Sequence, residues 1–210
     1  MFDVIHKGGP LMYLIILCSI IALAVVIERL WHLYRAKINT QEFMQDLSRH
    51  IRKNKIVEAI DLCDQTPGPI ASTLKAGILK HDRARDEIKE AVQDASLDEV
   101  PRLEKNLGVL ATIAHITPLL GLLGTVAGMI KCFQAIQTKA SAFNPISPGD
   151  LAEGIWMALI TTAAGLTVAI PTLVAYNYLV SRVNNFVLDM ERSATELINT
   201  LSQRSEGYEV

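Results

Sequence analysis

Charged side chains are absent from three long stretches of the 210-residue sequence, although 20% of its residues are charged. These stretches are residues 8–27, 106–130 and 154–181, which are 20, 25 and 28 residues long. A bilayer core about 30 Å thick is crossed by roughly 20 apolar helical residues, so each stretch can span it. This separation of charged from uncharged stretches excludes an ordinary soluble globular domain and predicts three transmembrane helices.

Residues that carry enzymatic or metal chemistry are equally scarce. Cys18, Cys63 and Cys132 lie too far apart for a CxxC pair or a zinc-binding spacing, so we expect neither a structural disulfide nor a metal site. No HExxH, P-loop, GxSxG or paired-carboxylate pattern occurs, and we expect no cofactor and no enzymatic activity. The formal net charge of -2 provides no basic surface for nucleic acid.

Lysine and arginine predict the orientation, because basic residues near the spans favour the cytoplasmic side. One side has Lys7, Lys131 and Lys139. The other has Arg29, Arg35, Lys37, Lys89, Arg102, Lys105, Arg182 and Arg192. We therefore expect the N-terminus outside and the C-terminus inside. The first stretch is predicted to be a retained helix and not a cleaved signal peptide. It is followed by Glu28-Arg29 and not by a small-residue cleavage site.

The predicted fold is an all-α membrane protein with three transmembrane helices and long helical cytoplasmic extensions. In a bacterium its outer side faces the periplasm. The expected segments are the periplasmic N-terminus and first span (1–27), a helical cytoplasmic loop (28–105), the second span (106–135), a short periplasmic loop (136–153), the third span (154–181) and a cytoplasmic helical tail (182–210).

Helical periodicity continues in the charged segments. Phe43, Leu47 and Ile51 recur every fourth residue and lie on one helix face. The Thr-Pro-Gly-Pro sequence at 66–69 predicts a break, after which helical patterns resume over 70–80 and 85–97. We expect Pro101 to kink the chain or to start a new helix. No stretch favours a strand.

Two further patterns flank the third span. Asn144-Pro145 predicts a turn, and Pro148 suits the first position of a helix, in a loop too short to form a domain. After the span, a heptad-like apolar stripe is expected to pack against the cytoplasmic loop in preference to a coiled coil with another protein. The stripe comprises Val183, Val187, Met190, Ala194, Leu197 and Leu201.

The spans differ in composition. The first is rich in Leu, Ile and Val and is expected to face lipid, whereas the other two carry stripes of small residues that let helices approach closely. The second span has Pro118, Gly121, Thr125 and Gly128, and Gly124 forms a GxxxG pair with Gly128. The third has Ala158, Thr162, Gly165, Ala169 and Thr172.

These stripes have two interpretations, tight packing alone or a polar path lined by hydroxyl groups. Counted from Lys131 and Glu153, Thr125 and Thr162 lie at similar depths, about 9 and 14 Å from the outer boundary. One hydroxyl from each antiparallel helix could then donate and accept hydrogen bonds there. Pro118 and Pro171 also free two backbone carbonyls that need partners in lipid.

No carboxylate lies within the uncharged stretches, although an ion path normally needs an ionisable group. Apart from Cys18 and the tyrosines, His115 is the titratable residue in these stretches. A histidine that packs between helices and bonds to a neighbouring carbonyl is at least as well supported as a proton relay. Either the chain conducts nothing or a partner helix supplies the carboxylate.

Several motifs together resemble the MotA/TolQ/ExbB proton channel family over essentially the whole chain. They are Gly8-Gly9-Pro10-Leu11-Met12-Tyr13, Glu28-Arg29-Leu30-Trp31, the run from Thr117-Pro118-Leu119 to Gly124-Thr125-Val126, Thr161-Thr162-Ala163-Ala164-Gly165-Leu166, Ala169-Ile170-Pro171 and Ala175-Tyr176-Asn177. The ExbB/TolQ branch fits better than the flagellar stator branch, whose members are longer and have four spans.

The resemblance implies a pentameric ring of this subunit around a dimeric, single-span partner similar to ExbD or TolR, which carries the missing aspartate. It also implies that protons pass threonines that correspond to Thr125 and Thr162, with Thr161 beside them. Force would reach an envelope protein similar to TonB or TolA. Membrane lipids surround such a subunit in the bacterial inner membrane.

One position departs from the family pattern. Where many relatives have an intramembrane glutamate, this chain has Met157. Glu153 lies one turn earlier, about 6 Å higher, and our hypothesis is that it takes over at the outer mouth of the path. The competing interpretations are that the glutamate is dispensable or that this subunit conducts poorly.

Two functions follow. The favoured one is a non-enzymatic subunit that couples proton-motive force to mechanical work, with protons favoured over sodium by the resemblance. The alternative is a non-conducting membrane scaffold that assembles envelope proteins, which the polar stripes permit and Met157 favours.

Overall fold

The computed structural model describes residues 8–141 and 147–206, and within them the chain forms only helices. These are α2 (Pro10–Ala36), α3 (Thr40–Arg52), α4 (Ile56–Gln65), α5 (Pro69–Ile78), α6 (Arg85–Glu104), α7 (Leu107–Ser141) and α8 (Pro148–Glu206). Three helical segments are long and apolar enough to cross a membrane, which confirms the predicted fold class. The division into outer and cytoplasmic segments stays a prediction.

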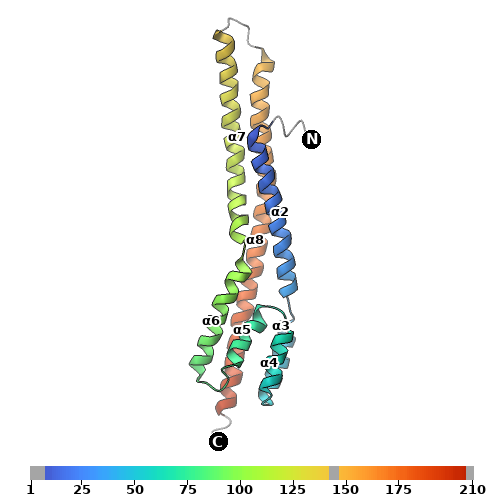
Figure 1. The fold of residues 1–210 in the computed structure, drawn as a ribbon, viewed down its shortest axis with the longest axis vertical. Coiled ribbons are helices and arrows are strands. Elements are labelled where there is room, and N and C mark those ends of the chain that lie inside the picture. Colours follow the sequence, from blue (N-terminus) through green and yellow to red (C-terminus); the bar gives the residue numbers. More distant parts are fainter. Residues whose placement is uncertain (1–7, 142–146, 207–210) are drawn as a thin grey trace. The chain divides into compact units, whose positions relative to one another are not determined.

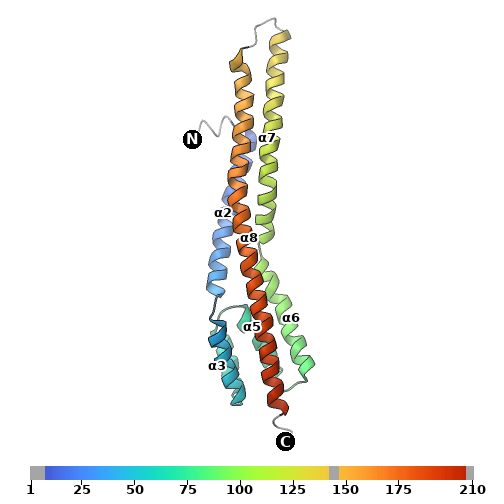
Figure 2. The same cartoon turned by 180° about the vertical axis from the view of Figure 1, so that it is seen from behind.

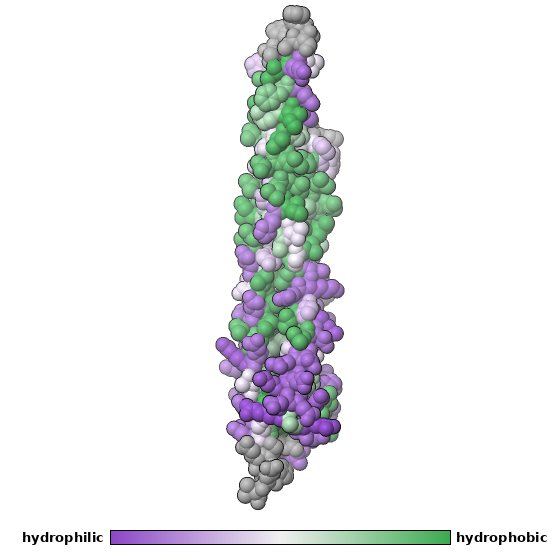
Figure 3. All heavy atoms as spheres, turned by 90° about the vertical axis from the view of Figure 1, so that its left-hand side faces the viewer, coloured by the Kyte–Doolittle hydropathy of each residue, from purple (hydrophilic) through white to green (hydrophobic). Residues whose placement is uncertain are grey.

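The first of two compact units comprises Met1–Glu28 and Asn106–Tyr178. In it the N-terminal part of α2, α7 and the N-terminal part of α8 lie side by side, with α7 and α8 antiparallel (Figure 1 and Figure 2). Large apolar side chains such as Leu23, Leu119 and Ile170 are exposed on all three helices. The face of this unit drawn in Figure 3 is largely green, the colour of hydrophobic residues. Such a surface suits lipid or another membrane helix.

The second unit comprises Arg29–Lys105 and Leu179–Val210, and contains α3 to α6 with the C-terminal part of α8. The α3 helix starts after Asn39, whose side-chain amide donates to the Glu42 carboxylate at 3.1 Å. The predicted apolar face is confirmed, because Phe43, Leu47 and Ile51 are all buried.

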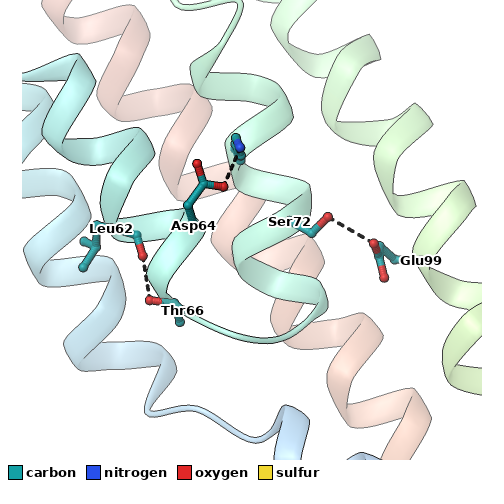
Figure 4. Close-up of polar contacts among 6 residues, drawn as sticks. Leu62, Asp64, Thr66, Ser72 and Glu99 are labelled. Carbon is teal, nitrogen blue, oxygen red and sulfur yellow. Dashed lines mark hydrogen bonds and ion pairs between the residues drawn. The ribbon is translucent and has the colours of Figure 1, made fainter.

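The predicted break at residues 66–69 separates α4 from α5. Gly68 has φ +123°, and a Cβ atom there would lie 2.8 Å from the carbonyl oxygen of Ala36, so the position requires glycine. Pro69 then starts α5, because a first-turn proline sacrifices no helical hydrogen bond. The Thr66 hydroxyl donates to the carbonyl oxygen of Leu62 at 2.7 Å, which ties the loop back to α4 (Figure 4).

Of the two outcomes predicted for Pro101, the start of a new helix is wrong. Pro101 lies inside α6, which continues to Glu104, and the new helix starts at Leu107. Asn106 between them has φ 63°, a left-handed conformation that asparagine tolerates better than most residues. Its side-chain amide also donates to the Glu28 carboxylate at 2.8 Å.

In α8 the third span and the tail form one continuous helix that begins at Pro148, as predicted, whereas Asn144-Pro145 lies outside the described residues. Most of the tail stripe is buried, with Val187 and Ala194 half-buried. A Cβ atom at Gly77 of α5 would lie 2.6 Å from Val92 Cγ2 and 3.1 Å from Leu197 Cδ2. The stripe therefore packs against the loop helices, as predicted.

The thiol of Cys63 provides a test of this second unit. Cys63 is buried in α4, and burial raises its pKa to about 12, with a further contribution from the negative charge of Asp64. Because only the thiolate reacts, we expect alkylation at pH 8 to be more than about a hundredfold slower than at Val57→Cys, an exposed position on the same helix. Peptide mass spectrometry measures both sites, and similar rates would contradict this packing.

Candidate ion pathway

The candidate pathway lies in the first unit, where α7 and α8 make a contact built from small residues. A Cβ atom at Gly121 would lie 3.0 Å from the Cα atom of Thr162, and one at Gly124 would overlap the Thr161 side chain. At Gly165 it would lie 2.7 Å from the carbonyl oxygen of Thr117. Only hydrogen fits at these positions, so the two backbones approach closely.

The other predicted packing residues divide between this contact and its surroundings. A Cβ atom at Gly128 would overlap the Gly154 carbonyl and lie 2.9 Å from the Ala158 Cβ atom, which places both Gly128 and Ala158 in the contact. Pro118 is half-buried and Pro171 is exposed, and each lies inside a continuous helix.

Thr161 lies at the centre of the contact. Its side chain is 0% exposed, and its hydroxyl donates within its own helix, 2.8 Å from the Met157 carbonyl oxygen and 3.1 Å from that of Ala158. Both partners belong to α8, so this hydroxyl makes no polar contact with α7. Burial against Gly124 gives Thr161 the features of a packing residue.

Thr162 instead reaches across the helix contact. Its half-buried hydroxyl lies 3.1 Å from the carbonyl oxygen of Gly121 on α7 and 3.1 Å from that of Ala158 on α8, so its single proton is shared between two acceptors. Both lone pairs of the hydroxyl oxygen can still accept. Thr162 therefore provides an interhelical polar link at the edge of the small-residue contact.

Thr125 lies one helical turn from Gly121, which corresponds to about 6 Å along the helix axis. Its side chain is half-buried, and its hydroxyl donates to the carbonyl oxygen of Leu122 at 2.6 Å. The structure thus places Thr125 about one turn from the level of Thr162. A proton or an ordered water between these levels would meet two hydroxyl oxygens that can each accept a hydrogen bond.

Glu153 and Met157 lie one turn apart on α8 but in different surroundings. Met157 is 2% exposed, and a Cβ atom at Gly9 would lie 2.7 Å from its Cε atom, so it packs where α2 begins. Glu153 is exposed. Nine residues separate Glu153 from Thr162, or about 14 Å along the helix, so the two side chains do not meet directly.

The remaining titratable candidate is His115 on α7. Its side chain is exposed, and Nδ1 lies 2.6 Å from the carbonyl oxygen of Ala111, one turn earlier in the same helix. The predicted neighbouring carbonyl is thus found within α7. In the part of the chain that the structure describes, no group of three His, Cys, Asp or Glu residues could hold a metal ion.

Three contact residues were missing from the predicted stripes: Thr117, Cys132 and Gly154. Thr117 is 0% exposed and donates to the Ile113 carbonyl at 2.5 Å, and the Cys132 thiol donates to the Leu151 carbonyl at 3.3 Å. Stripes of small residues drawn in a shifted register on each helix would have identified Thr117 and Gly154. Positions 117, 121, 124 and 128 and positions 154, 158, 161 and 165 both follow steps of 4, 3 and 4 with small residues throughout.

Comparison with known proteins gives a consistent match. The model of the MotA/TolQ/ExbB proton channel family matches residues 65–192, which include α5, α6, α7 and most of α8. A homolog of the biopolymer transport protein ExbB from Methanothermobacter thermautotrophicus is 29% identical over 99% of this chain and 70% of that protein.

Two bacterial relatives are similar over shorter regions. The ExbB-like protein 1 of Synechocystis is 32% identical over 86% of this chain and 71% of its own length. The Tol-Pal system protein TolQ of Haemophilus influenzae is 38% identical over 52% of this chain and 46% of its own length.

Substitution of the central glycine tests the helix contact. In Gly124→Ala the new methyl group would overlap Thr161, so we expect a loss of about 1–3 kcal/mol in stability from overpacking. The matched control is Gly108→Ala on the same helix, where no atom lies within 4 Å of the added Cβ. Thermal unfolding in detergent should show a lower midpoint for the first variant alone, and equal midpoints would contradict the contact.

Proposed function

Because the chain belongs to the MotA/TolQ/ExbB proton channel family, we propose that it is an ExbB/TolQ-like subunit of a proton-driven motor in the bacterial inner membrane. In this proposal five copies form a ring around an ExbD/TolR-like single-span partner, which carries a membrane aspartate. The ring couples proton-motive force to mechanical work on a TonB- or TolA-like envelope protein. The names of the relatives, biopolymer transport and Tol-Pal system proteins, support this assignment.

One observation carries the proposal: the Thr162 hydroxyl bridges the α7–α8 contact and the half-buried Thr125 hydroxyl lies about one turn from it, while the uncharged stretches contain no carboxylate. Thr125 and Thr162 offer acceptor lone pairs about one helical turn apart. A hydroxyl can pass a proton but does not hold it near neutral pH, so a conducting path needs an ionisable group from a partner. The two subunits would then supply complementary parts of one channel.

Orientation and the outer entrance are part of this proposal. With the N-terminus outside, the exposed Glu153 lies at the outer end of α8, where a carboxylate can exchange protons with water. From there a proton would pass Thr125 and Thr162 on its way to the partner's aspartate. Thr161 is the predicted pathway residue with the weakest support, because its buried hydroxyl donates only within α8.

A non-conducting scaffold is the second candidate, and a specific observation favours it. The threonine hydroxyls of the described spans donate to backbone carbonyls, which is a common way to satisfy them in a packed membrane helix. In addition, an apolar residue, Met157, occupies the buried position on α8 one turn from Glu153. A subunit that only assembles envelope proteins would need nothing more from these groups.

Ion flux in proteoliposomes separates the two functions. Vesicles would contain a pH-sensitive dye and this chain, either alone or with an ExbD/TolR-like partner. We expect dissipation of a pH gradient only when both subunits are present, because the carboxylate and the hydroxyls belong to different chains. A stable complex without flux would favour the scaffold.

Removal of one hydroxyl at a time tests the proposed path. Thr125→Val and Thr162→Val preserve side-chain shape, so the ring should assemble while proton flux with the partner falls about tenfold or more, as expected when a proton-transfer group is lost. Thr112→Val is the matched control, because Thr112 also lies on α7 and its exposed hydroxyl bonds only its own helix. Unchanged flux in both test variants would assign these threonines to packing.

The entrance has its own test. Glu153→Gln keeps the size of the side chain and one acceptor oxygen but cannot take up a proton. We expect flux to fall several-fold, because the amide cannot pass a proton from water into the path. The exposed Glu191→Gln on the tail of α8 serves as the control. Flux unchanged by Glu153→Gln would remove Glu153 from the path.

A further inference from the structure

A cavity of about 350 Å³ lies in the second unit, apart from the α7–α8 contact. Its walls are the last turns of α2, the loop between α4 and α5, and the last turns of α6. The polar side chains that line it are His32, Arg35, Glu99 and Arg102, and Pro67 and Pro69 form part of the apolar wall.

The walls of this cavity are held in place by specific contacts. Gly68 sets the loop against the carbonyl of Ala36 at the end of α2. The carboxylate of Glu99 on α6 accepts a hydrogen bond from the Ser72 hydroxyl at 3.0 Å (Figure 4). It accepts another from Arg102, also at 3.0 Å. Glu99 is thus engaged by two donors, and its charge is balanced by that of Arg102.

The cavity retains an excess of positive charge. After the pairing of Glu99 with Arg102, Arg35 forms no ion pair among the described residues. The Arg102 side chain is 72% exposed, so most of its N–H groups also remain available. A guanidinium has five N–H donors in a planar arrangement that matches a phosphate group. His32 adds a further donor beside them.

The sequence of α2 places this cavity next to the lipid headgroups. The uncharged stretch ends at residue 27, so His32 and Arg35 follow after five and eight residues, or about 8 and 12 Å along the helix. Each headgroup layer is about 5–7 Å thick, so both backbone positions lie at or just beyond its outer edge. Helical side chains tilt toward the N-terminus of their helix, so the long Arg35 side chain extends back toward the headgroups. Trp31 and Tyr34 are 72% and 81% exposed, and such aromatic residues are typical of the membrane interface.

We propose that this cavity binds the phosphate group of an anionic phospholipid, with Arg35 and Arg102 as the main donors and His32 beside them. A lipid is the occupant because the cavity lies beside interface aromatics on a helix that leaves the membrane. The proposal requires only that α2 spans the bilayer and is independent of ion conduction. Its failure would leave the motor function untouched, and a failure to conduct protons would leave this site untouched.

Tryptophan quenching tests the proposal in the full-length chain. The sequence has two tryptophans, so Trp156→Phe leaves Trp31 as the reporter, one turn from Arg35. The protein is reconstituted in two sets of phosphatidylcholine vesicles. Both contain the same fraction of a lipid that is brominated near the headgroup end of its chains. This lipid is phosphatidylglycerol in one set and phosphatidylcholine in the other. Each arginine near the surface contributes about a fivefold preference for anionic lipid, so brominated phosphatidylglycerol should quench Trp31 more strongly.

Three variants test whether the preference for anionic lipid depends on the cavity. Arg35→Gln should reduce it by about fivefold, while Arg35→Lys should retain most of it because the charge is kept. Arg52→Gln removes the same charge from the exposed last turn of α3, outside the cavity, and should leave the preference unchanged. Arg35 is chosen because substitution of Arg102 would also disturb its contact with Glu99.

Four results would overturn the proposal. They are equal quenching by the two lipids, an unchanged preference in Arg35→Gln, an equal loss in Arg52→Gln, and loss of the preference when inorganic phosphate is added. The last result would mean that the cavity takes free phosphate and not a lipid headgroup.

Discussion

The contact between α7 and α8 is the constraint on which the first unit depends. In lipid, burial of apolar surface gives two helices no reason to associate, so their contact relies on close packing and on interhelical hydrogen bonds. Here the glycines of α7 face the threonines and small residues of α8 so closely that a single added methyl group would collide. A contact of this kind has one register, because a slide along the axis would bring Thr161 away from Gly124. The hydroxyl groups at its edge therefore have fixed positions.

The same geometry divides two adjacent threonines between different roles. Successive residues in a helix point about 100° apart. When Thr161 fills the space beside Gly124, Thr162 must therefore point toward the edge of the contact, where it reaches the Gly121 carbonyl. The first stabilises the helix pair by filling volume, and the second places a hydroxyl beside the neighbouring helix. The packing thus buries the Thr161 hydroxyl and leaves the Thr162 hydroxyl at the edge of the contact.

The sequence predicted the helices better than it predicted the roles of residues at the contact. Periodicity identified the buried face at Phe43, and the prolines at 67 and 69 marked the break between α4 and α5. The change from loop to span between residues 105 and 106 was predicted from the charge pattern. The helix break with a left-handed Asn106 was not, because such a conformation depends on its surroundings, including here the Glu28 carboxylate. The α8 stripe was placed on Thr162 and not on Thr161, since small residues occur in both registers and only the neighbouring helix selects between them.

The exchange of a buried glutamate for Met157 follows from the same energetics. A carboxylate at this position would be buried where α2 begins, and its ionised form would lose hydration unless a partner compensated it. Methionine fills the space without that cost, because its flexible thioether adapts to irregular gaps. The carboxylate of Glu153 is exposed and keeps its contact with water. This arrangement leaves an apolar side chain at the buried position and a carboxylate at the exposed one, one turn away. The uncharged stretches of this chain therefore contain hydroxyls and one histidine but no carboxylate.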